Sequence, residues 1–586
     1  MFKLLKHLKL PEWVMALVSL LFITAQVWLE LRMPEYMAEI TRLVKTPGSE
    51  MSRIVSAGLN MLLCALGSLA FAVTVGYFAA RIGSAFSRRL RRLLFDKVES
   101  FSMEEINRFS TSSLITRSTN DITQVQILII IAMQLVLKAP LMAIWAITKI
   151  YGKGMEWSLV TASGVLFVLI MVSLLMVFVM PKFKMMQTLT DNITRVTREN
   201  LTGLRVIRAY NAQDYQGEKF GKANTELTAT HLYTNRAMSL MMPLMTLMMS
   251  GITLAIYIVG AYLVDAAGFF SKLQIFSDMV VFSQYAMQVI MSFMMLVMIF
   301  IIYPRASVSA RRIHEVLDTS PAIKDGTLTN GKPDARGEVT FRHVSFKYPG
   351  AEEYVLEDIS FTAAKGETVA FIGSTGSGKS TLIDLIPRFY DATEGEVLLD
   401  GENVKDYTLE ALYSKIGYVP QRAVMFMGTV HSNVAYGDNG GGDYTEDAVR
   451  EAVAIAQGTD FVEKMDGMYE AHIARDGMNI SGGQKQRLAI ARAVCRRPEF
   501  YIFDDSFSAL DYQTDRALRS RLKRETAGVT TFIVAQRIGT IMDADRIIVL
   551  DDGRIAGQGT HLELLRNCDV YREIAVSQLS EEELQS

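Results

Sequence analysis

The residues best suited to chemistry in this sequence form a glycine-rich loop of the kind that binds phosphate groups. The loop fits the pattern G-x-x-x-x-G-K-[ST] and consists of Gly373, Ser374, Thr375, Gly376, Ser377, Gly378, Lys379 and Ser380, with Thr381 following. In such a loop the backbone N–H groups surround the phosphates, the lysine reaches the β- and γ-phosphates, and the last hydroxyl binds Mg²⁺. Alone, this pattern predicts only a nucleotide-binding protein, of which there are many kinds.

Two short apolar runs are suited to position this loop and an acidic residue beside it. Residues 368–372 predict a buried strand that leads into the loop, and residues 379–389 predict a helix whose N-terminus meets the phosphates. Residues 500–504 predict a second buried strand that ends in Asp504. Its carboxylate is placed to hold the Mg²⁺ shell. We therefore expect a nucleotide and Mg²⁺ as cofactors, with Ser380 and Asp504 on the metal; the resemblance described next implies that the nucleotide is ATP.

A second motif narrows the class of nucleotide-binding protein. The run Ser481, Gly482, Gly483 and Gln484, about a hundred residues after the phosphate loop, resembles the signature of ABC-transporter ATPases. This resemblance implies that Tyr348 stacks on adenine, that Gln421 contacts Mg²⁺ and senses the membrane domain, and that Ser508 and Asp511 belong to a D-loop. In that family two ATPase domains sandwich ATP head to tail, and each signature faces the phosphate loop of the other domain. The implied partner is a second ABC half-transporter.

Two positions depart from the family pattern. Where the family has a glutamate after the aspartate of the second strand, this chain has Asp505, and where the family has a switch histidine it has Gln536. The missing methylene withdraws the carboxylate by about 1.5 Å, and an amide carries no proton at neutral pH. We expect this chain's own site to bind ATP and to cleave it slowly. A heterodimer whose partner carries the proper residues is favoured over a slow homodimer.

The bulk composition divides the chain in two and excludes some functions. The chain has 586 residues, too many for one core, and 50% of them are hydrophobic. The mean hydropathy is +0.20, and the apolar excess lies before about residue 304. A net charge of −2 gives no indication of a nucleic-acid partner. The 3 cysteines have no metal-binding spacing and form no disulfide framework, so we expect buried or membrane thiols.

Six apolar stretches predict helical membrane spans, at residues 13–33, 54–80, 127–150, 157–180, 238–264 and 276–303. Each has the ~20 residues needed to cross the hydrocarbon core. The first could instead be a signal peptide, but it is too long and lacks a small-residue cleavage site, so we expect a retained span. The predicted fold class is a six-span α-helical membrane domain with long cytoplasmic helical extensions, followed by an α/β P-loop ATPase domain of the ABC type.

The basic residues predict the orientation of these spans. Lysine and arginine concentrate in segments 81–126 and 181–237, whereas the short turns at 151–156 and 265–275 carry one lysine each. Both long segments, both termini and the ATPase domain are therefore expected in the cytoplasm of a multi-pass cell-membrane protein. Within the long segments, residues 114–121 and 199–210 resemble the family's coupling regions. The predicted boundaries are 1–304 for the membrane domain, 305–336 for a linker and 337–586 for the ATPase domain.

The sequence indicates the transported substrate only weakly. Methionines recur at helical spacing in the last two spans, at Met238, Met241, Met242, Met245, Met248 and Met249 and at Met287, Met291, Met294, Met295 and Met298. They suit a promiscuous apolar surface, but packing between helices or against lipid is the simpler interpretation. Lys138 is the clearest ionisable residue inside a span, facing a cavity or extending to the interface.

The function predicted from these features is ATP-driven export of hydrophobic or amphipathic compounds, drugs or lipids, by a chain similar to ABC exporter half-transporters of the multidrug-resistance type. This chain would work as one subunit of an ABC-type translocase and lend its signature to the partner's catalytic site. Two alternatives stay open: export of peptides, and a regulatory ATP-binding subunit with little role in transport.

Overall fold

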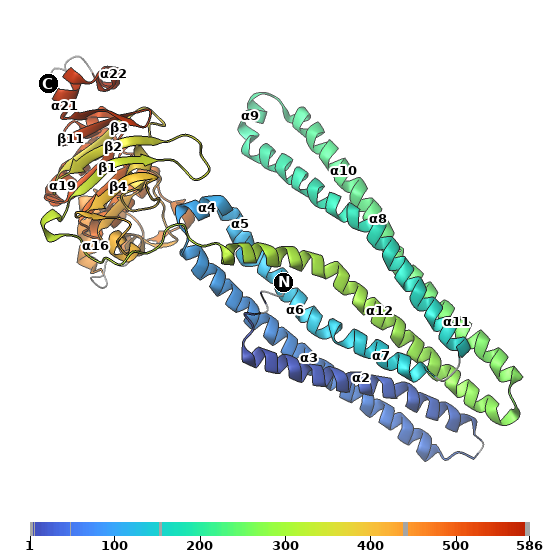
Figure 1. The fold of residues 1–586 in the computed structure, drawn as a ribbon. Coiled ribbons are helices and arrows are strands. Elements are labelled where there is room, and N and C mark those ends of the chain that lie inside the picture. Colours follow the sequence, from blue (N-terminus) through green and yellow to red (C-terminus); the bar gives the residue numbers. More distant parts are fainter. Residues whose placement is uncertain (1–3, 5, 47, 152–154, 438–443, 580–586) are drawn as a thin grey trace. The chain divides into compact units, whose positions relative to one another are not determined.

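The chain separates into two compact units. The computed structural model describes residue 4 and residues 6–46, 48–151, 155–437 and 444–579 (Figure 1). One unit, here called the helical unit, comprises residues 1–99 and 111–319. The other, the sheet unit, comprises residues 100–110 and 320–586. The short segment 100–110 therefore packs with the second half of the chain although it lies inside the first half of the sequence.

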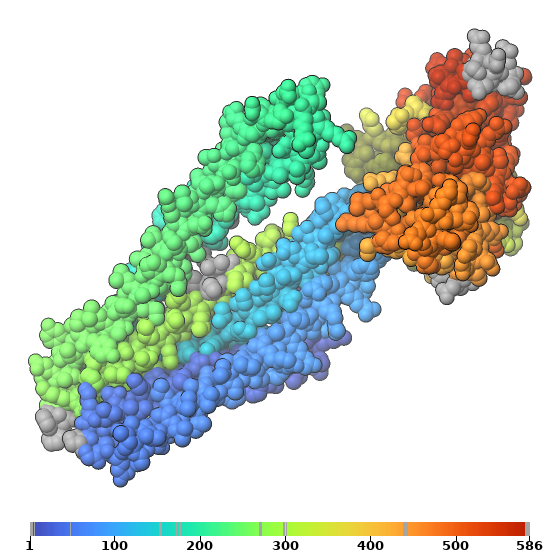
Figure 2. Space-filling view, turned by 180° about the vertical axis from the view of Figure 1, so that it is seen from behind, coloured from blue at the N-terminus to red at the C-terminus, as the bar shows by residue number. Residues whose placement is uncertain are grey.

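The helical unit consists of long helices joined by short turns. They are α2 (Leu10–Lys45), α3 (Met51–Glu99), α5 (Thr111–Thr116), α6 (Ile122–Ile131), α7 (Lys138–Ile150), α8 (Met155–Thr202), α9 (Leu204–Ala209), α10 (Gln213–Ser239), α11 (Met241–Ala266) and α12 (Phe269–Asp318), with π-helical turns η1 (Arg117–Asp121) and η2 (Ala132–Val136) on either side of α6. Helices α8 and α10 pack together as an arm, and the end of this arm at α9 stands apart from the other helices of the unit (Figures 1 and 2).

Five helical stretches among the described residues are long and apolar enough to cross a membrane. They are Leu10–Lys45, Met51–Glu99, Thr111–Ile150, Gln213–Ala266 and Lys272–Leu296. The predicted span 157–180 lies in α8, where Met155–Met171 is an apolar helical stretch among the described residues. Residues 152–154 of the turn before it lie outside the described residues. The expected class of helical membrane domain is confirmed.

Several helices extend far beyond the thickness of a bilayer. With 49 residues, α3 spans about 73 Å at 1.5 Å per residue, more than twice a hydrocarbon core of about 30 Å. Helix α12 continues through Pro304 as far as Asp318, so the first part of the predicted linker 305–336 is helical. These extensions fit the helical segments that the sequence predicted beyond the spans.

A polar cluster lies among the spans of the helical unit. Lys138 at the start of α7 donates to Glu30 of α2 at 2.8 Å, and the same Glu30 Oε1 accepts from Gln26 at 2.8 Å and from Ser68 of α3 at 3.0 Å. Only 16–17% of either charged side chain is exposed. Lys138 is thus paired across helices rather than extended to the interface.

The methionine-rich helices contribute mainly to packing. Met245 and Met248 of α11 are buried in the core of the helical unit, beside Tyr285 and Ile256. Met242 and Met291 are exposed, and the side chain of Met298 lies outside the described residues. The described methionines therefore fit the packing interpretation at least as well as a substrate surface.

The buried pair yields a stability prediction with an internal control. Lys138→Met leaves the Glu30 carboxylate in a mostly apolar bundle without its cation, so we expect a loss of about 3 kcal/mol. Lys149→Met breaks a second pair between the same two helices, Lys149–Glu35 at 2.6 Å, whose side chains are 43% and 33% exposed. That loss should stay below about 1 kcal/mol. Thermal unfolding of both variants in detergent measures the difference, and equal destabilisation would contradict the assignment.

The sheet unit is built on two larger sheets. The six-stranded sheet has the order β12–β11–β3–β10–β9–β6, in which β11, β3, β10, β9 and β6 are parallel and β12 is antiparallel. Its strands are β3 (Thr368–Gly373), β6 (Ile416–Val419), β9 (Phe500–Asp504), β10 (Thr530–Val534), β11 (Arg546–Asp551) and β12 (Arg554–Gly559). The four-stranded antiparallel sheet consists of β1 (Val339–Phe346), β2 (Leu356–Ala363), β4 (Glu394–Leu399) and β5 (Glu402–Asn403).

Helices cover these sheets and close the unit. They are α4 (Met103–Phe109), α13 (Lys379–Asp384), α14 (Leu409–Ser414), α15 (Val430–Val434), α16 (Glu446–Ile455), α17 (Thr459–Val462), α18 (Gly482–Cys495), α19 (Tyr512–Glu525), α20 (Ile538–Ile541), α21 (His561–Asn567) and α22 (Asp569–Gln578), with a small ribbon of β7 (Gly428–Thr429) and β8 (His472–Ile473). Helix α13 ends at Asp384, whereas the sequence predicted a helix to residue 389. Pro387 explains this early end, because proline lacks the N–H that the helix needs and disfavours helical geometry just before it.

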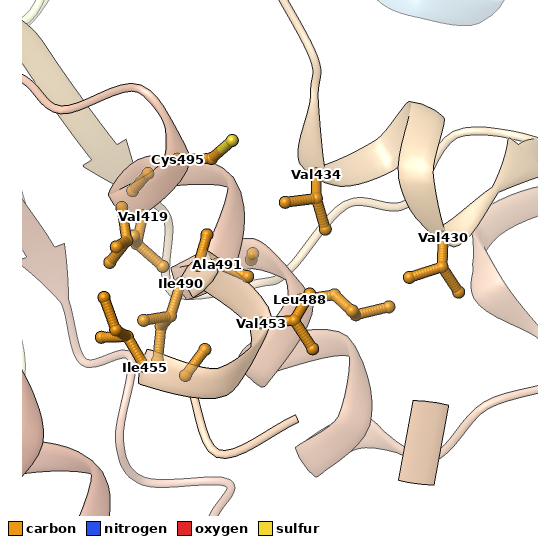
Figure 3. Close-up of a cluster of buried hydrophobic side chains, with 14 of the residues drawn as sticks. Val419, Val430, Val434, Val453, Ile455, Leu488, Ile490, Ala491 and Cys495 are labelled. Carbon is orange, nitrogen blue, oxygen red and sulfur yellow. The ribbon is translucent and has the colours of Figure 1, made fainter. Parts of the chain in front are cut away.

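Helix α18 is anchored by an apolar core. Leu488, Ile490 and Ala491 of α18 pack with Val419 of β6 and with valines of α15 and α16 (Figure 3). Cys495 at the end of α18 and Cys568 are buried, Cys64 is partly buried, and all 3 thiols are free, as the sequence predicted. Burial raises the pKa of Cys495 to about 11, which keeps this thiol protonated. This core fixes the position of the signature motif at the start of α18.

Candidate functional site

The glycine-rich loop connects β3 to α13 at the carboxyl edge of the parallel sheet. Gly376 and Gly378 have φ angles of 89° and 92°, in the left-handed region that favours glycine. A Cβ at Gly373 would collide with the carbonyl oxygen of Leu550 in the neighbouring strand. Glycine is therefore required both by the turn and by the close approach of two strands. This is the strand–loop–helix arrangement that phosphate binding needs.

Lys379 is held inside this loop. Its ammonium group donates to the carbonyl oxygens of Gly373 at 2.9 Å and Ser374 at 2.7 Å and to Ser377 Oγ at 3.3 Å. Burial lowers the pKa of Lys379, while Asp505 and Asp504 partly offset this effect. The positive charge of Lys379 therefore lies inside the loop. A bound phosphate could take over from these carbonyl oxygens as the acceptor of its hydrogen bonds.

Asp504, at the end of β9, meets the loop from the neighbouring part of the sheet. Ser380 Oγ donates to Asp504 Oδ1 at 2.9 Å. Burial raises the pKa of Asp504, and the charge of Asp505 adds to this shift, while the Ser380 hydrogen bond opposes it. A dication placed here would relieve the cost of burying these carboxylates.

The donor set of this corner suits Mg²⁺. Ser380 and Asp504 offer a hydroxyl and a carboxylate oxygen, and Gln421 offers an amide oxygen, which are the hard donors that Mg²⁺ prefers. Because Ser380 and Asp504 already contact each other at 2.9 Å, one cation can reach both. These residues would hold the metal, whose chemistry is to neutralise charge on the phosphates.

Asp505 receives two amide groups on a single oxygen. Its Oδ2 accepts from Gln536 Nε2 at 2.8 Å and from Gln421 Nε2 at 3.3 Å. The backbone at Asp505 is in the left-handed region with φ 44°, and Ser508 Oγ donates to its carbonyl oxygen at 3.0 Å. Burial raises the pKa of Asp505, although the hydrogen bond from Gln421 opposes this shift. The structure therefore brings together both positions that depart from the family pattern.

Tyr348 lies beside the first turn of α13. Its hydroxyl is 2.9 Å from Thr381 Oγ1, and its ring meets Phe346 and Tyr390 edge to face at centroid distances of 5.0 and 5.3 Å. These contacts hold one ring at a fixed position near the start of the phosphate-binding helix. The predicted base-stacking residue and Thr381 are thus adjacent.

The signature motif forms the start of α18, whereas the phosphate loop leads into α13. Ser481 is the N-cap: its Oγ accepts from Gln484 N at 3.3 Å, and Gln484 Oε1 accepts from Ser481 N at 2.8 Å. A Cβ at Gly482 would meet nothing within 4 Å, whereas at Gly483 it would meet the carbonyl oxygen of Ala509 at 3.3 Å. Among the described residues, no hydrogen bond joins the motif to the loop 373–380.

In the predicted D-loop, Asp511 caps α19. Its Oδ1 accepts from Thr514 N at 3.0 Å, and this hydrogen bond holds the pKa of the Asp511 carboxyl below its usual range. Ser508 is tied to Asp505 as described above. The D-loop therefore connects the short carboxylate to a firmly capped helix.

The sequence patterns did not identify three residues that lie near the site. Tyr418 donates to Asp384 Oδ1 at 3.1 Å, and burial raises the pKa of Asp384 to about 6. Gln578 of α22 donates to the carbonyl oxygen of Gln536 at 2.9 Å, and its Oε1 accepts from Ile538 N at 2.8 Å. Gln578 thus braces the Gln536 segment from more than forty residues away in the chain, and no local pattern indicates it.

Comparisons with known proteins agree with this architecture. Residues 356–508 match the family model of the ABC transporter, and residues 16–293 match that of the ABC transporter transmembrane region. The chain is 40% identical to an uncharacterised ABC transporter ATP-binding protein of Mycobacterium bovis over 522 residues, 88% of this chain and 87% of that protein. It is 32% identical to an ATP-dependent lipid A-core flippase of Pseudomonas putida, over 86% of this chain and 82% of the flippase.

A solved structure shares the fold over nearly the whole chain. The structure of a bacterial Atm1-family ABC exporter with ATP bound superposes with a TM-score of 0.80. The alignment covers 97% of this chain and 98% of the exporter chain, at 23% sequence identity. The similarity at this identity concerns the fold.

The raised pKa of Asp384 gives a pH-dependent stability prediction. A carboxyl whose pKa is about 6 when folded and 3.8 when exposed destabilises the fold above pH 6, and the penalty disappears as the pH falls towards 3.8. Asp384→Asn keeps an oxygen for Tyr418 and removes the charge. It should stabilise the protein by up to about 3 kcal/mol at pH 7.5 and by about half of that at pH 5.

Thermal unfolding in detergent at both pH values, without nucleotide, measures this effect. Asp406→Asn, at an exposed position of the same unit, controls for the substitution itself. A gain for Asp384→Asn that is the same at both pH values would contradict the role of the buried charge.

Proposed function

The chain belongs to the ABC transporter family, and we propose that it is the weakly hydrolysing subunit of a heterodimeric exporter of hydrophobic or amphipathic compounds. Its transmembrane region and ABC ATPase domain occur in one chain, the organisation of an exporter half-transporter. ABC exporters function as dimers. The lipid A-core flippase among its relatives favours lipids over drugs as the substrate class.

The observation that carries the proposal is that Asp505 Oδ2 accepts two hydrogen bonds, one from Gln536 and one from Gln421. A general base needs a free lone pair within about 2.6–3.2 Å of the proton that it abstracts. Asp505 is one methylene shorter than glutamate, and one of its two carboxylate oxygens, Oδ2, already accepts from two amide N–H groups. Gln536 can donate to a phosphate but cannot take up or release a proton. This pair favours binding over cleavage.

The binding groups belong to a different part of the site. The backbone of residues 373–380 and Lys379 would hold the phosphates, and the ring of Tyr348 would stack on the base. Of the described residues at the site, none of these binding groups hydrogen-bonds to Gln536. We infer that Mg²⁺ and ATP stay bound at this site while the partner's site turns over.

The signature would complete the partner's site. Ser481 is held by its capping box, and Gly482 leaves open space that a phosphate of the ATP bound to another chain can approach. The N-terminus of α18 provides N–H groups and a positive dipole end for that phosphate. In the proposed cycle, two bound ATP molecules close the ATPase dimer, the long helices transmit this closure to the membrane domain, and hydrolysis at the partner's site reopens it.

The orientation proposed from the basic segments places both termini and the ATPase domain in the cytoplasm, with export directed outward. Peptide export and a purely regulatory subunit remain competing hypotheses. Transport assays in vesicles, with this chain alone and together with a co-purified partner, distinguish the regulatory hypothesis from a transporting subunit.

The weak catalytic site makes a direct kinetic prediction. The purified chain alone should bind Mg·ATP and release phosphate slowly, whereas the double variant Asp505→Glu/Gln536→His should gain about 10²-fold in turnover, within the range of general-base catalysis. Phosphate release in lipid nanodiscs measures both rates. Lys379→Ala, which removes the phosphate contact, serves as the inactive control. Brisk turnover by the unaltered chain would contradict the proposal.

The signature gives a second prediction that separates folding from function. Because nothing lies within 4 Å of a Cβ at Gly482, Gly482→Val should leave the thermal unfolding of this chain unchanged. In the complex with the partner it should reduce hydrolysis by at least about 10²-fold, since the side chain blocks a donor group at the transferring phosphate.

Gly58→Val, in α3 and also without neighbours within 4 Å, is the matched control and should keep full hydrolysis. Full activity of the Gly482→Val complex would show that the motif does not serve the partner's nucleotide.

A further inference from the structure

A cavity beside Tyr348 contains a carboxylate from an unexpected segment. The cavity has a volume of about 380 Å³ and is lined by Tyr348, Pro349, Gly350, Tyr390 and Glu104, among other residues. Glu104 belongs to α4, which is separated from the ATPase sequence by more than two hundred residues but packs in the sheet unit. We propose that Glu104 accepts a hydrogen bond from the 6-amino group of adenine, so that α4 recognises the base of the bound nucleotide. The inference rests on the proposed ATP site with its base on Tyr348.

Helix α4 is held firmly against the sheet unit. Glu105 is buried, and its Oε1 accepts from the backbone N–H of Ala322 at 2.9 Å. The Oε2 of Glu105 accepts from the backbone N–H of Ser102 at 2.8 Å and from its hydroxyl at 2.6 Å. Near the other end, Asn107 Nδ2 donates to the hydroxyl of Tyr390 at 3.0 Å. With both ends fixed, Glu104 is presented to the cavity from a rigid position.

The aromatic wall of the cavity connects α4 to the nucleotide site. Tyr390 meets the ring of Tyr348 edge to face at 5.3 Å, and the Tyr348 hydroxyl lies 2.9 Å from Thr381 in the first turn of α13. Burial is the main cause of the raised pKa of Tyr390, and the charge of Glu104 adds to it, so the carboxylate lies within electrostatic range of this ring. Tyr348 therefore connects this aromatic wall to the phosphate-binding helix α13, and Tyr390 connects it to α4 through Asn107.

This arrangement selects a group on the base by its chemistry. A purine is joined to the ribose through its five-membered ring, so a base stacked on Tyr348 would direct its six-membered ring away from the phosphates, into the cavity that Tyr348 and Glu104 both line. An ionised carboxylate only accepts hydrogen bonds. Adenine offers one exocyclic donor there, its 6-amino group; guanine has an acceptor, O6, at that position and carries its donors at N1 and at the 2-amino group. Stacking on Tyr348 alone would not distinguish bases, because every base has a π-face.

The test combines a change in the protein with a change in the ligand. The full-length chain in nanodiscs is titrated calorimetrically with Mg·ATP and with the Mg²⁺ complex of purine riboside 5′-triphosphate, which lacks the 6-amino group. The unaltered chain should bind ATP about tenfold more tightly than the analogue, the scale of one hydrogen bond to a charged group. In Glu104→Ala the two affinities should become equal, and Glu104→Gln, which keeps an acceptor oxygen, should give an intermediate ratio.

Glu410→Ala is the matched control, because Glu410 is an acidic residue in the first turn of another short helix of this unit, α14, outside the cavity. It should keep the tenfold ratio. An unchanged ratio in Glu104→Ala would overturn the inference, and so would a GTP affinity that exceeds that of ATP and falls on removing Glu104. Lys379→Ala distinguishes this failure from failure of the proposed function: if it binds ATP as well as the unaltered chain, the nucleotide site itself is wrongly placed.

Discussion

The hydrogen bonds on Asp505 Oδ2 depend on the order of three neighbouring parallel strands. β6, β9 and β10 lie side by side in the sheet, and Gln421, Asp505 and Gln536 each follow one of them within two residues of its end. Because parallel strands end at the same edge, residues separated by up to 115 positions in the sequence meet there. The phosphate loop follows β3, the next strand beyond β10, so the proposed binding and catalytic positions share one edge.

The sequence predicted the elements of this edge well, because their signals are local. Residues 500–504 form an uninterrupted apolar run closed by an aspartate, and the observed strand has these bounds. The glycine-rich loop is recognisable because each glycine has a backbone role that no other residue fills. Helix α13 is shorter than predicted because Pro387 interrupts helical geometry before the predicted end at residue 389.

The contacts that the sequence did not reveal are long-range. Lys138 was noticeable as a charge inside a span, but its partner Glu30 lies 108 residues earlier, and no pattern in either helix connects them. Segment 81–126 is uniformly polar and helical in composition, so nothing in it separates α4 from its neighbours. The assignment of residues 100–110 to the sheet unit depends on the buried Glu105 and its hydrogen bond to Ala322, which only the folded structure brings together.

In the proposed function, separate elements would supply binding and catalysis at this site, so that one could weaken without the other. Phosphate binding would use the backbone of a loop whose shape is fixed by Gly373, Gly376 and Gly378 and does not depend on the side chains that follow β9 and β10. In the proposed function, catalysis would depend on the reach of one carboxylate, and a shortening of about 1.5 Å would be enough to slow it strongly. Asp504, which contacts Ser380, stays in the binding group, while the next residue, Asp505, turns away through its left-handed backbone towards Gln536. The boundary between the two proposed roles therefore lies at the peptide bond between Asp504 and Asp505.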